Sequence, residues 1–179
     1  MKHSVKIAYG GILCGLSILF LFLTGLFPFA DYALPALSGM CLIPLVIDFG
    51  YRNAVIAYVA VSVLGALVVP NKECVVLFIA FLGYYPILKG RIETLRNRVT
   101  EWLIKLVWFN AAAVIAYYLM VQVLGITQVM EDFQGLRLGL WGVLLAGNVV
   151  FVIFDFALTR VISLFVHQIR PKYLRYLSK

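Results

Sequence analysis

The stretch VKIAYGGILCGLSILFLFLTGLF (Val5–Phe27) decides the fold class of this chain. It is an apolar run of 23 residues whose one charged side chain, Lys6, lies at its start. Because a helix of about 20 apolar residues crosses the hydrocarbon core of a bilayer, the run predicts a membrane-spanning helix. It has no small-residue cleavage site of the kind that ends a signal peptide, so we expect it to remain in the protein.

The composition of the whole chain agrees with this first run. Hydrophobic residues make up 64% of the 179 residues, charged residues make up 13%, and the mean hydropathy is +1.01. A soluble domain is about half apolar and a quarter charged. The chain is therefore expected to be an integral protein of the cell membrane, folded as one domain over residues 1–179 with no separate soluble domain.

Apolar runs between polar breaks predict an all-α, polytopic membrane protein with six transmembrane helices. The predicted helices are Val5–Phe27, Leu34–Ile47, Ala54–Val69, Cys74–Leu88, Trp102–Leu124 and Leu138–Val166. The second to fourth have only 14 to 16 residues, which reach about 21–24 Å against a hydrocarbon core of about 30 Å. Either these helices extend into interfacial residues, or the second and third form a hairpin that does not span.

The distribution of positive charge predicts the orientation. With a cytoplasmic N-terminus, 13 of the 15 Lys and Arg residues fall on the inner side, and only Lys72 and Arg137 fall outside. Cytoplasmic loops of membrane proteins carry such an excess of Lys and Arg. Both termini are therefore predicted to be cytoplasmic, and the net charge of +7 is attributed to topology and to anionic lipid headgroups, not to nucleic-acid binding.

Motifs for catalysis or for cofactor binding are absent from the sequence. There is no GxxxxGK[ST] loop for nucleotide phosphates and no HExxH zinc motif, and the two histidines, His3 and His167, lie near opposite ends of the chain. Its three cysteines are too far apart for a CxxC metal site. We expect neither enzymatic activity nor a bound cofactor or metal.

Polar residues inside the predicted helices need partners, because an unpaired polar group in hydrocarbon is costly. Asn110 and Asn148 lie at depths where they could form an amide clamp between the fifth and sixth helices, and the alternative is that Asn148 contacts a substrate. Asp155 is expected to be tethered to a cytoplasmic-side base such as Lys105, with a proton relay as the alternative.

The inner side of the chain yields two further expectations. Asp48, at the inner end of the second helix, is expected to pair with Arg52, four residues on. The polar segment Leu88–Lys105 has helical spacing and predicts an amphipathic helix on the inner surface, either a solvated connector or a partner-docking element. Within it, Glu101 and Lys105 are spaced for an ion pair.

Candidates for solute binding lie at the opposite, outer ends of the helices. Aromatic walls with a few orienting polar groups are typical of small-ligand sites, although each residue alone could be an interface anchor or part of a solvated loop. The candidates are Asp31, Tyr32, Asn71, Lys72, Glu73, Gln122, Gln128 and Trp141.

A stripe of small residues marks the first helix. Ala8, Gly11 and Gly15 recur at intervals of three and four residues, so they share one helix face, and such a face lets another helix approach closely. Either the stripe packs against the protein's own helices or it is a docking face for another membrane protein.

The six-helix pattern with this stripe resembles the S components of energy-coupling factor (ECF) transporters. The AxxxA-type pattern of that family falls on Gly11 and Gly15, with glycine in place of alanine. The resemblance implies a subunit that binds a vitamin or other small solute and docks on a transmembrane coupling protein that works with cytoplasmic ATPases. By position it implies solute contacts at Glu73, Gln122 and Trp141, and we add Asn148 as a candidate.

Two other classes of protein fit the same pattern. One is a non-transport scaffold, such as the MreD-like cell-shape proteins, which would bind morphogenetic partners and no solute. The other is a small proton-coupled carrier that uses Asp155. An outer pocket of about 300 Å³ or more would favour solute capture, whereas a shallow outer face would favour the scaffold.

Overall fold

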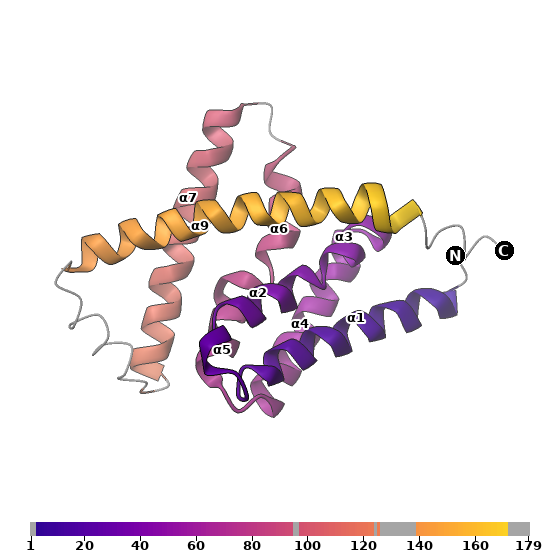
Figure 1. Cartoon of the computed structure of the whole chain (residues 1–179), viewed down its shortest axis with the longest axis horizontal. Helices are drawn as coiled ribbons and strands as arrows, with labels where there is room; N and C mark the ends of the chain where they lie inside the picture. The colour runs from indigo at the N-terminus through magenta and orange to yellow at the C-terminus, as the bar shows by residue number, and fades with distance from the viewer. Residues whose placement is uncertain (1–2, 95–96, 124, 126–138, 172–179) are drawn as a thin grey trace.

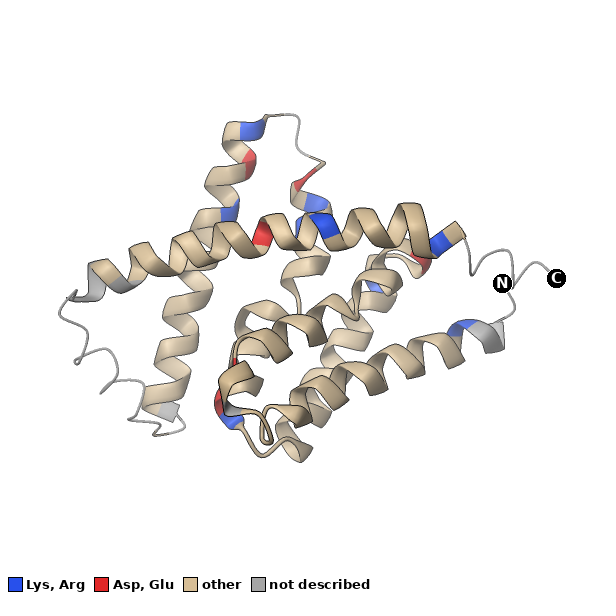
Figure 2. Ribbon diagram, in the orientation of Figure 1, with Lys and Arg blue, Asp and Glu red and all other residues tan. Residues whose placement is uncertain are grey.

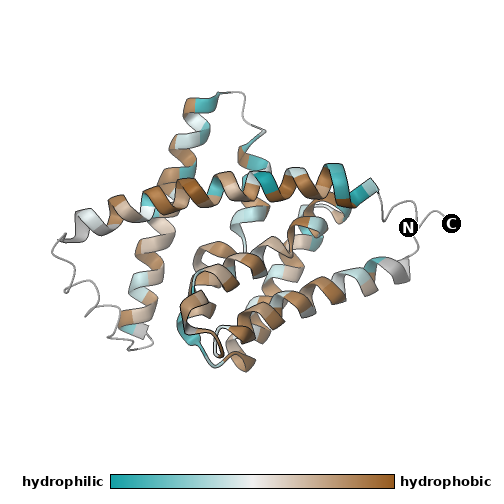
Figure 3. Cartoon of the chain, viewed as in Figure 1, coloured by the Kyte–Doolittle hydropathy of each residue, from teal (hydrophilic) through white to brown (hydrophobic). Residues whose placement is uncertain are grey.

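The computed structural model describes residues 3–94, 97–123, 125 and 139–171, and over these residues the chain is all-helical (Figure 1). Five of its helical segments are long and apolar enough to cross a membrane, and a sixth apolar segment, Ala33–Phe49, is shorter. The five segments are Lys6–Leu23, Tyr51–Val68, Lys72–Ile92, Arg98–Gln122 and Leu144–Ile169. Apolar residues run along most of their length (Figure 3). The prediction of an all-α class is confirmed.

The predicted second helix, Leu34–Ile47, is divided into two helices, α2 (Ala33–Met40) and α3 (Ile43–Phe49). Pro44 lies in the first turn of α3. A proline ring clashes with the carbonyl four residues before it, which here is that of Met40, the last residue of α2. The position of Pro44 in the sequence therefore accounts for the division of this segment into two helices.

The N-terminal half continues as an antiparallel pair of helices. After α1 (His3–Leu23) and the short 3-10 helix η1 (Pro28–Ala30), the chain runs through α2 and α3 to α4 (Tyr51–Val68). Only Gly50 separates α3 from α4, and its φ of 81° lies in the left-handed region that glycine adopts without strain. The tight reversal packs α3 against α4, and α1 packs against both α2 and α4.

The next long segment contains a local change of helix type. It consists of α5 (Lys72–Leu77), the π-helical turn η2 (Phe78–Leu82) and α6 (Tyr85–Ile92). Pro86 in the first turn of α6 has no N–H, so the Leu82 carbonyl loses its ordinary helical partner. That carbonyl lies against the backbone of Gly39 in α2, where a Cβ atom would stand only 2.0 Å from the Leu82 oxygen. Glycine at this position allows α2 and η2 to touch.

The C-terminal half consists of two long helices that cross each other (Figure 1). These are α7 (Arg98–Tyr118), which continues as the π-helical turn η3 (Leu119–Val123), and α9 (Gly139–Leu164), which continues as η4 (Phe165–Ile169). The predicted surface helix over Leu88–Lys105 is wrong. Its residues belong to the end of α6 and the start of α7, because Asn97 accepts a hydrogen bond from the Val99 N–H (3.1 Å) and begins a new helix.

Two apolar clusters hold these helices together. The first lies among α1, α3, α4, α5, η2 and α6, and its buried residues include Leu21, Leu45, Val61, Phe78 and Ile87. The second joins η2 and α6 to α7 and α9, and its buried residues include Phe81, Tyr85, Ala112, Phe151 and Leu158. Phe109 of α7 and Phe151 of α9 stack with ring centroids 4.7 Å apart. The clusters position α6 between the two halves of the molecule.

Charged residues gather at the ends of the helices and where α9 crosses α6 and α7 (Figure 2). At one end, Arg170 of α9's extension donates from Nε to Asp48 Oδ1 (2.9 Å), and the ammonium group of Lys6 lies 6.0 Å from the centroid of the Phe49 ring. The expected pairing of Asp48 with Arg52 is wrong. Asp48 reaches a residue 122 positions away, and this end therefore joins α1, α3 and the C-terminal helix.

Candidate functional site

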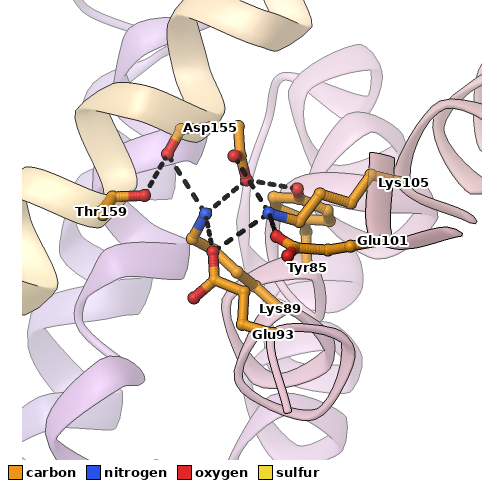
Figure 4. Close-up of polar contacts among 7 residues, drawn as sticks. All are labelled: Tyr85, Lys89, Glu93, Glu101, Lys105, Asp155 and Thr159. Atoms are coloured by element: carbon orange, nitrogen blue, oxygen red, sulfur yellow. Dashed lines mark hydrogen bonds and ion pairs between the residues drawn. The ribbon is translucent and has the colours of Figure 1, made fainter. Parts of the chain in front are cut away.

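A cluster of buried charges lies where α6, α7 and α9 meet (Figure 4). Lys89 of α6, Lys105 of α7 and Asp155 of α9 are only 0%, 1% and 3% exposed. Charged side chains are almost never fully buried unless they are paired. These three helices are thus held together by a polar contact as well as by the aromatic cluster beside it.

Asp155 is at the centre of this cluster. Its Oδ1 accepts hydrogen bonds from the Tyr85 hydroxyl (2.6 Å) and from Lys89 Nζ (2.5 Å), and its Oδ2 lies 3.2 Å from Lys105 Nζ. The predicted tether between Asp155 and Lys105 is confirmed. Thr159 donates to the backbone carbonyl of Asp155 (2.9 Å), one turn along the same helix.

Two glutamates complete the cluster on its more open side. Glu93 Oε1 lies 2.6 Å from Lys89 Nζ and 3.0 Å from Lys105 Nζ, and Glu101 Oε1 lies 2.7 Å from Lys105 Nζ. The predicted ion pair between Glu101 and Lys105 is therefore confirmed. The Glu93 side chain is 35% exposed, so this is where the cluster reaches the surface. Together the five groups carry two positive and three negative formal charges.

Lys89 is one of the 13 positive charges predicted on the inner side, and its burial was not predicted. Tyr85, Lys89 and Glu93 are spaced four residues apart, so they share one face of α6 and its C-terminal cap. That face combines an aromatic ring, an ammonium group and a carboxylate. The spacing could have predicted a polar face turned toward another helix, although not the identity of its partner on α9.

The cluster can act as an ionic lock between helices. Removing one partner from a buried ion pair typically destabilises a protein by about 3–5 kcal/mol, because the other charge stays buried without compensation. Here each lysine contacts Asp155 and Glu93 at once, so two cations share two carboxylates across three helices. The arrangement restricts the angle between α9 and the other two helices.

A second polar contact joins α7 to α9. Asn110 Nδ2 donates to Asn148 Oδ1 (2.9 Å), and Asn148 Nδ2 donates to Asn110 Oδ1 (3.1 Å). The amide groups also donate to the carbonyls of Leu106 (2.8 Å) and Leu144 (2.7 Å) on their own helices. The predicted amide clamp is confirmed, and Asn148, also a candidate solute contact, uses its side chain in this clamp.

The predicted outer residues near α5 form a compact polar contact. Asn71 caps α5 by accepting from the Cys74 N–H (3.3 Å) and donates to Asp31 Oδ1 (3.2 Å). Lys72 Nζ donates to the carbonyls of Ala66 (2.7 Å) and Val69 (2.9 Å), at the end of α4. These contacts bring together the starts of α2 and α5 and the end of α4.

The remaining outer candidates are less closely assembled. Glu73 is half-buried in the first turn of α5, and Gln122 is exposed in η3, a segment that contacts α5. Trp141 belongs to α9, but its side chain lies outside the described residues, as does all of Gln128. The structure therefore places α5, which carries Glu73, against η3, which carries Gln122. The positions of Trp141's side chain and of Gln128 in the predicted mouth stay predictions.

The small-residue stripe of α1 lies on the outside of the protein. Ala8, Gly11 and Gly15 are all exposed, and a Cβ atom added to either glycine would meet no atom of the described residues within 4 Å. The opposite face of α1 is the one that packs internally: Ser17 is fully buried and its hydroxyl lies 2.6 Å from that of Ser38 in α2. The interpretation that the two glycines pack against this protein's own helices is wrong.

Comparison of the chain with protein-family models, with curated proteins and with solved structures finds no match in any of the three. The class is therefore defined by the fold itself. It is an all-helical protein with five described helices long and apolar enough to cross a membrane, and that arrangement is compatible with a membrane protein.

Proposed function

We propose that this chain is a multi-pass protein of the cell membrane that crosses the bilayer six times, with both termini in the cytoplasm. The broken segment Ala33–Phe49 would provide the sixth crossing. In support, Asp31 before the segment contacts Asn71 at one end of the bundle, while Asp48 near its close contacts Arg170 at the other. A helical segment of its 17 residues would reach about 26 Å.

We further propose that the protein works as a subunit docked on another membrane protein through α1. The observation that carries this proposal is the exposed stripe Ala8, Gly11 and Gly15 on α1. Only 11% of the residues in Lys6–Leu23 of this helix are buried. Small residues on a helix face do not improve its packing against lipid tails, whereas they let a helix of another protein approach the backbone closely. The resemblance to S components makes the coupling protein of an ECF importer the proposed partner.

In that role the chain would bind a vitamin or other small solute at its outer end and have no enzymatic activity of its own. Glu73 and Gln122, on neighbouring segments, are the proposed polar contacts, with Trp141 as an aromatic wall and Asn148 deeper in the bundle. Energy would come from the cytoplasmic ATPases of the complex, because the sequence has no phosphate-binding loop.

Docking is tested by the double variant Gly11→Leu/Gly15→Leu. The glycines have open space around them, so the variant is expected to fold normally and to lose most of the partner recovered by affinity purification in mild detergent. A matched control is Ala111→Leu/Ala157→Leu, which enlarges exposed small residues of α7 and α9. Equal recovery of partner by both variants would contradict the proposal.

Solute capture is tested separately, by mass spectrometry of small molecules and proteins that co-purify with the full chain. The importer proposal expects an ATPase-containing complex and a bound solute that is lost in Glu73→Gln. Recovery with cell-wall machinery alone, and with no solute, would overturn it.

One observation favours the scaffold as a second candidate function. The structure has a cavity of about 280 Å³ lined by Arg52 and Arg91, at the basic end of the bundle and away from the proposed mouth. A scaffold of the MreD-like kind would also dock partners through α1, but it needs no outer pocket. The mass-spectrometry experiment separates the two candidates. A proton-coupled carrier is favoured less, because both carboxylate oxygens of Asp155 already contact lysines.

A further inference from the structure

The cavity between α4 and α6 combines positive charge with apolar walls. Arg52 and Arg91 lie at its rim, and both are exposed. Val55, Ile87 and Leu88 line it on the apolar side. A cavity of about 280 Å³ with this lining suits an amphiphile with an anionic group.

The two arginines are available to a ligand. Among the residues that the structure describes, neither guanidinium lies within ion-pair distance of a carboxylate. Arg91 is held instead over the face of the Tyr51 ring, with its Cζ 4.6 Å from the centroid. That contact orients the cation while leaving its N–H donors free for an acceptor, and guanidinium groups bind phosphate oxygens with good geometry.

The walls of the cavity are fixed by neighbouring contacts. Tyr84, on one wall, accepts a hydrogen bond from Trp108 Nε1 (2.9 Å). Tyr51, on another, approaches the backbone of α6 so closely that a Cβ atom on Gly90 would stand 2.9 Å from its hydroxyl oxygen. Pre-formed walls of this kind are typical of small-molecule sites.

An exposed apolar path leads from the cavity along α4. Val55, Val59 and Val63 are 46%, 50% and 54% exposed and follow Arg52 at helical intervals. From Arg52 to Val63 the helix rises about 16 Å. A hydrocarbon tail could lie along this path while its headgroup stays between the arginines. A free inorganic anion has no tail and would make no contact with the apolar path.

We propose that this cavity binds the phosphate headgroup of an anionic phospholipid, with one acyl chain lying along α4. The inference depends on the protein being in a membrane and is independent of the importer function. Basic pockets between helices recognise anionic headgroups in this manner. Such a lipid would hold the start of α4 against the end of α6.

The test is native mass spectrometry of the full chain in mild detergent, titrated in parallel with phosphatidylglycerol, phosphatidylcholine and inorganic phosphate. Phosphatidylglycerol is expected to bind, with phosphatidylcholine clearly weaker and inorganic phosphate unable to compete. In Arg52→Gln/Arg91→Gln its apparent affinity should fall about 25-fold, because each cation near an anionic lipid contributes about five-fold. The matched pair Arg98→Gln/Arg160→Gln removes two other exposed arginines and should lose less than about two-fold.

A second variant separates the cavity from general surface charge. Val55→Trp retains both arginines and fills the cavity, so it should also lose phosphatidylglycerol, whereas Val114→Trp on the exposed surface of α7 should not. Equal losses in the two arginine pairs, or unchanged binding in Val55→Trp, would overturn the proposal. Competition by inorganic phosphate at the same concentration as the lipid would overturn it too.

Discussion

The bundle has two regions that involve α6 and that each contain a pair of cations, and they differ in what surrounds those cations. Lys89 and Lys105 are buried, and each contacts two or more carboxylates supplied by α6, α7 and α9. Arg52 and Arg91 lie at an open cavity with aromatic and apolar walls and no described carboxylate in reach. Lys89 and Arg91 are two residues apart and point to different sides of α6. Whether a cation on α6 is buried in ion pairs or open to a ligand thus depends on the helix that it faces.

The largest effect on stability is predicted for Asp155, in the buried cluster. In Asp155→Leu, two buried lysines lose the more buried of their two shared carboxylates, so we expect a loss of about 3–5 kcal/mol in stability. Thermal or denaturant unfolding in detergent measures it. Asp155→Asn, which keeps the size and the hydrogen bond with Tyr85, should lose less, and an unchanged unfolding midpoint in Asp155→Leu would show that the cluster is not a lock.

The next effect comes from coupling within the cluster. Lys89→Met combined with Asp155→Leu removes both partners of the 2.5 Å contact and should destabilise less than the sum of the single variants. A coupling energy of about 1–3 kcal/mol is expected for side chains in one network. Simple additivity in this double-mutant cycle would mean that the two residues act independently.

A smaller effect is expected at the amide clamp. Asn110→Leu and Asn148→Leu each leave one amide without its interhelical partner, and the coupling between them should be about 0.6 kcal/mol, the average for hydrogen bonds between membrane helices, and at most about 1.7 kcal/mol. The same unfolding measurement on the two single variants and the double variant gives this value. A clamp that couples more strongly than Lys89 and Asp155 would reverse the order proposed for the two contacts.

The smallest effect on stability is expected at the open cavity. Arg52→Gln should change the unfolding free energy by no more than about 0.5 kcal/mol in lipid-free detergent, because an exposed residue with no ion pair to any described residue contributes little. Lys105→Gln is the contrasting variant in the buried cluster. A large loss in Arg52→Gln would show that the cavity residues hold the fold together by themselves.

Those features that depend on position along a single helix were predictable from the sequence. The depths of Asn110, Asn148, Asp155 and Lys105 follow from the rise of a helix, so the clamp and the tether could be paired correctly. The class of fold followed from hydropathy in the same way. Spacing also identified the exposed stripe of α1, although which side it faces came only from the structure.

Contacts whose partners do not follow from depth along two helices were not predictable in this way. Asp48 was assigned to Arg52 because the two are four residues apart, whereas its partner Arg170 is reached only when the last helix folds back. The breaks near Pro44 and Asn97 did have local signals, a proline clash and a helix cap, and hydropathy alone passed over them. Lys89 combines the two cases, since the spacing of Tyr85, Lys89 and Glu93 could have predicted a polar face on α6, whereas its partner on α9 could not be predicted.

The lock also bears on how the chain is made. Asp155 lies on α9, the last long helix in chain order, while Lys89 and Lys105 precede it by 66 and 50 residues. During synthesis the two lysines are therefore translated before their central counter-ion, with only the glutamates beside them. A nascent chain stopped before α9 would carry these two lysines without Asp155, so the lock between the three helices closes only once α9 has been made.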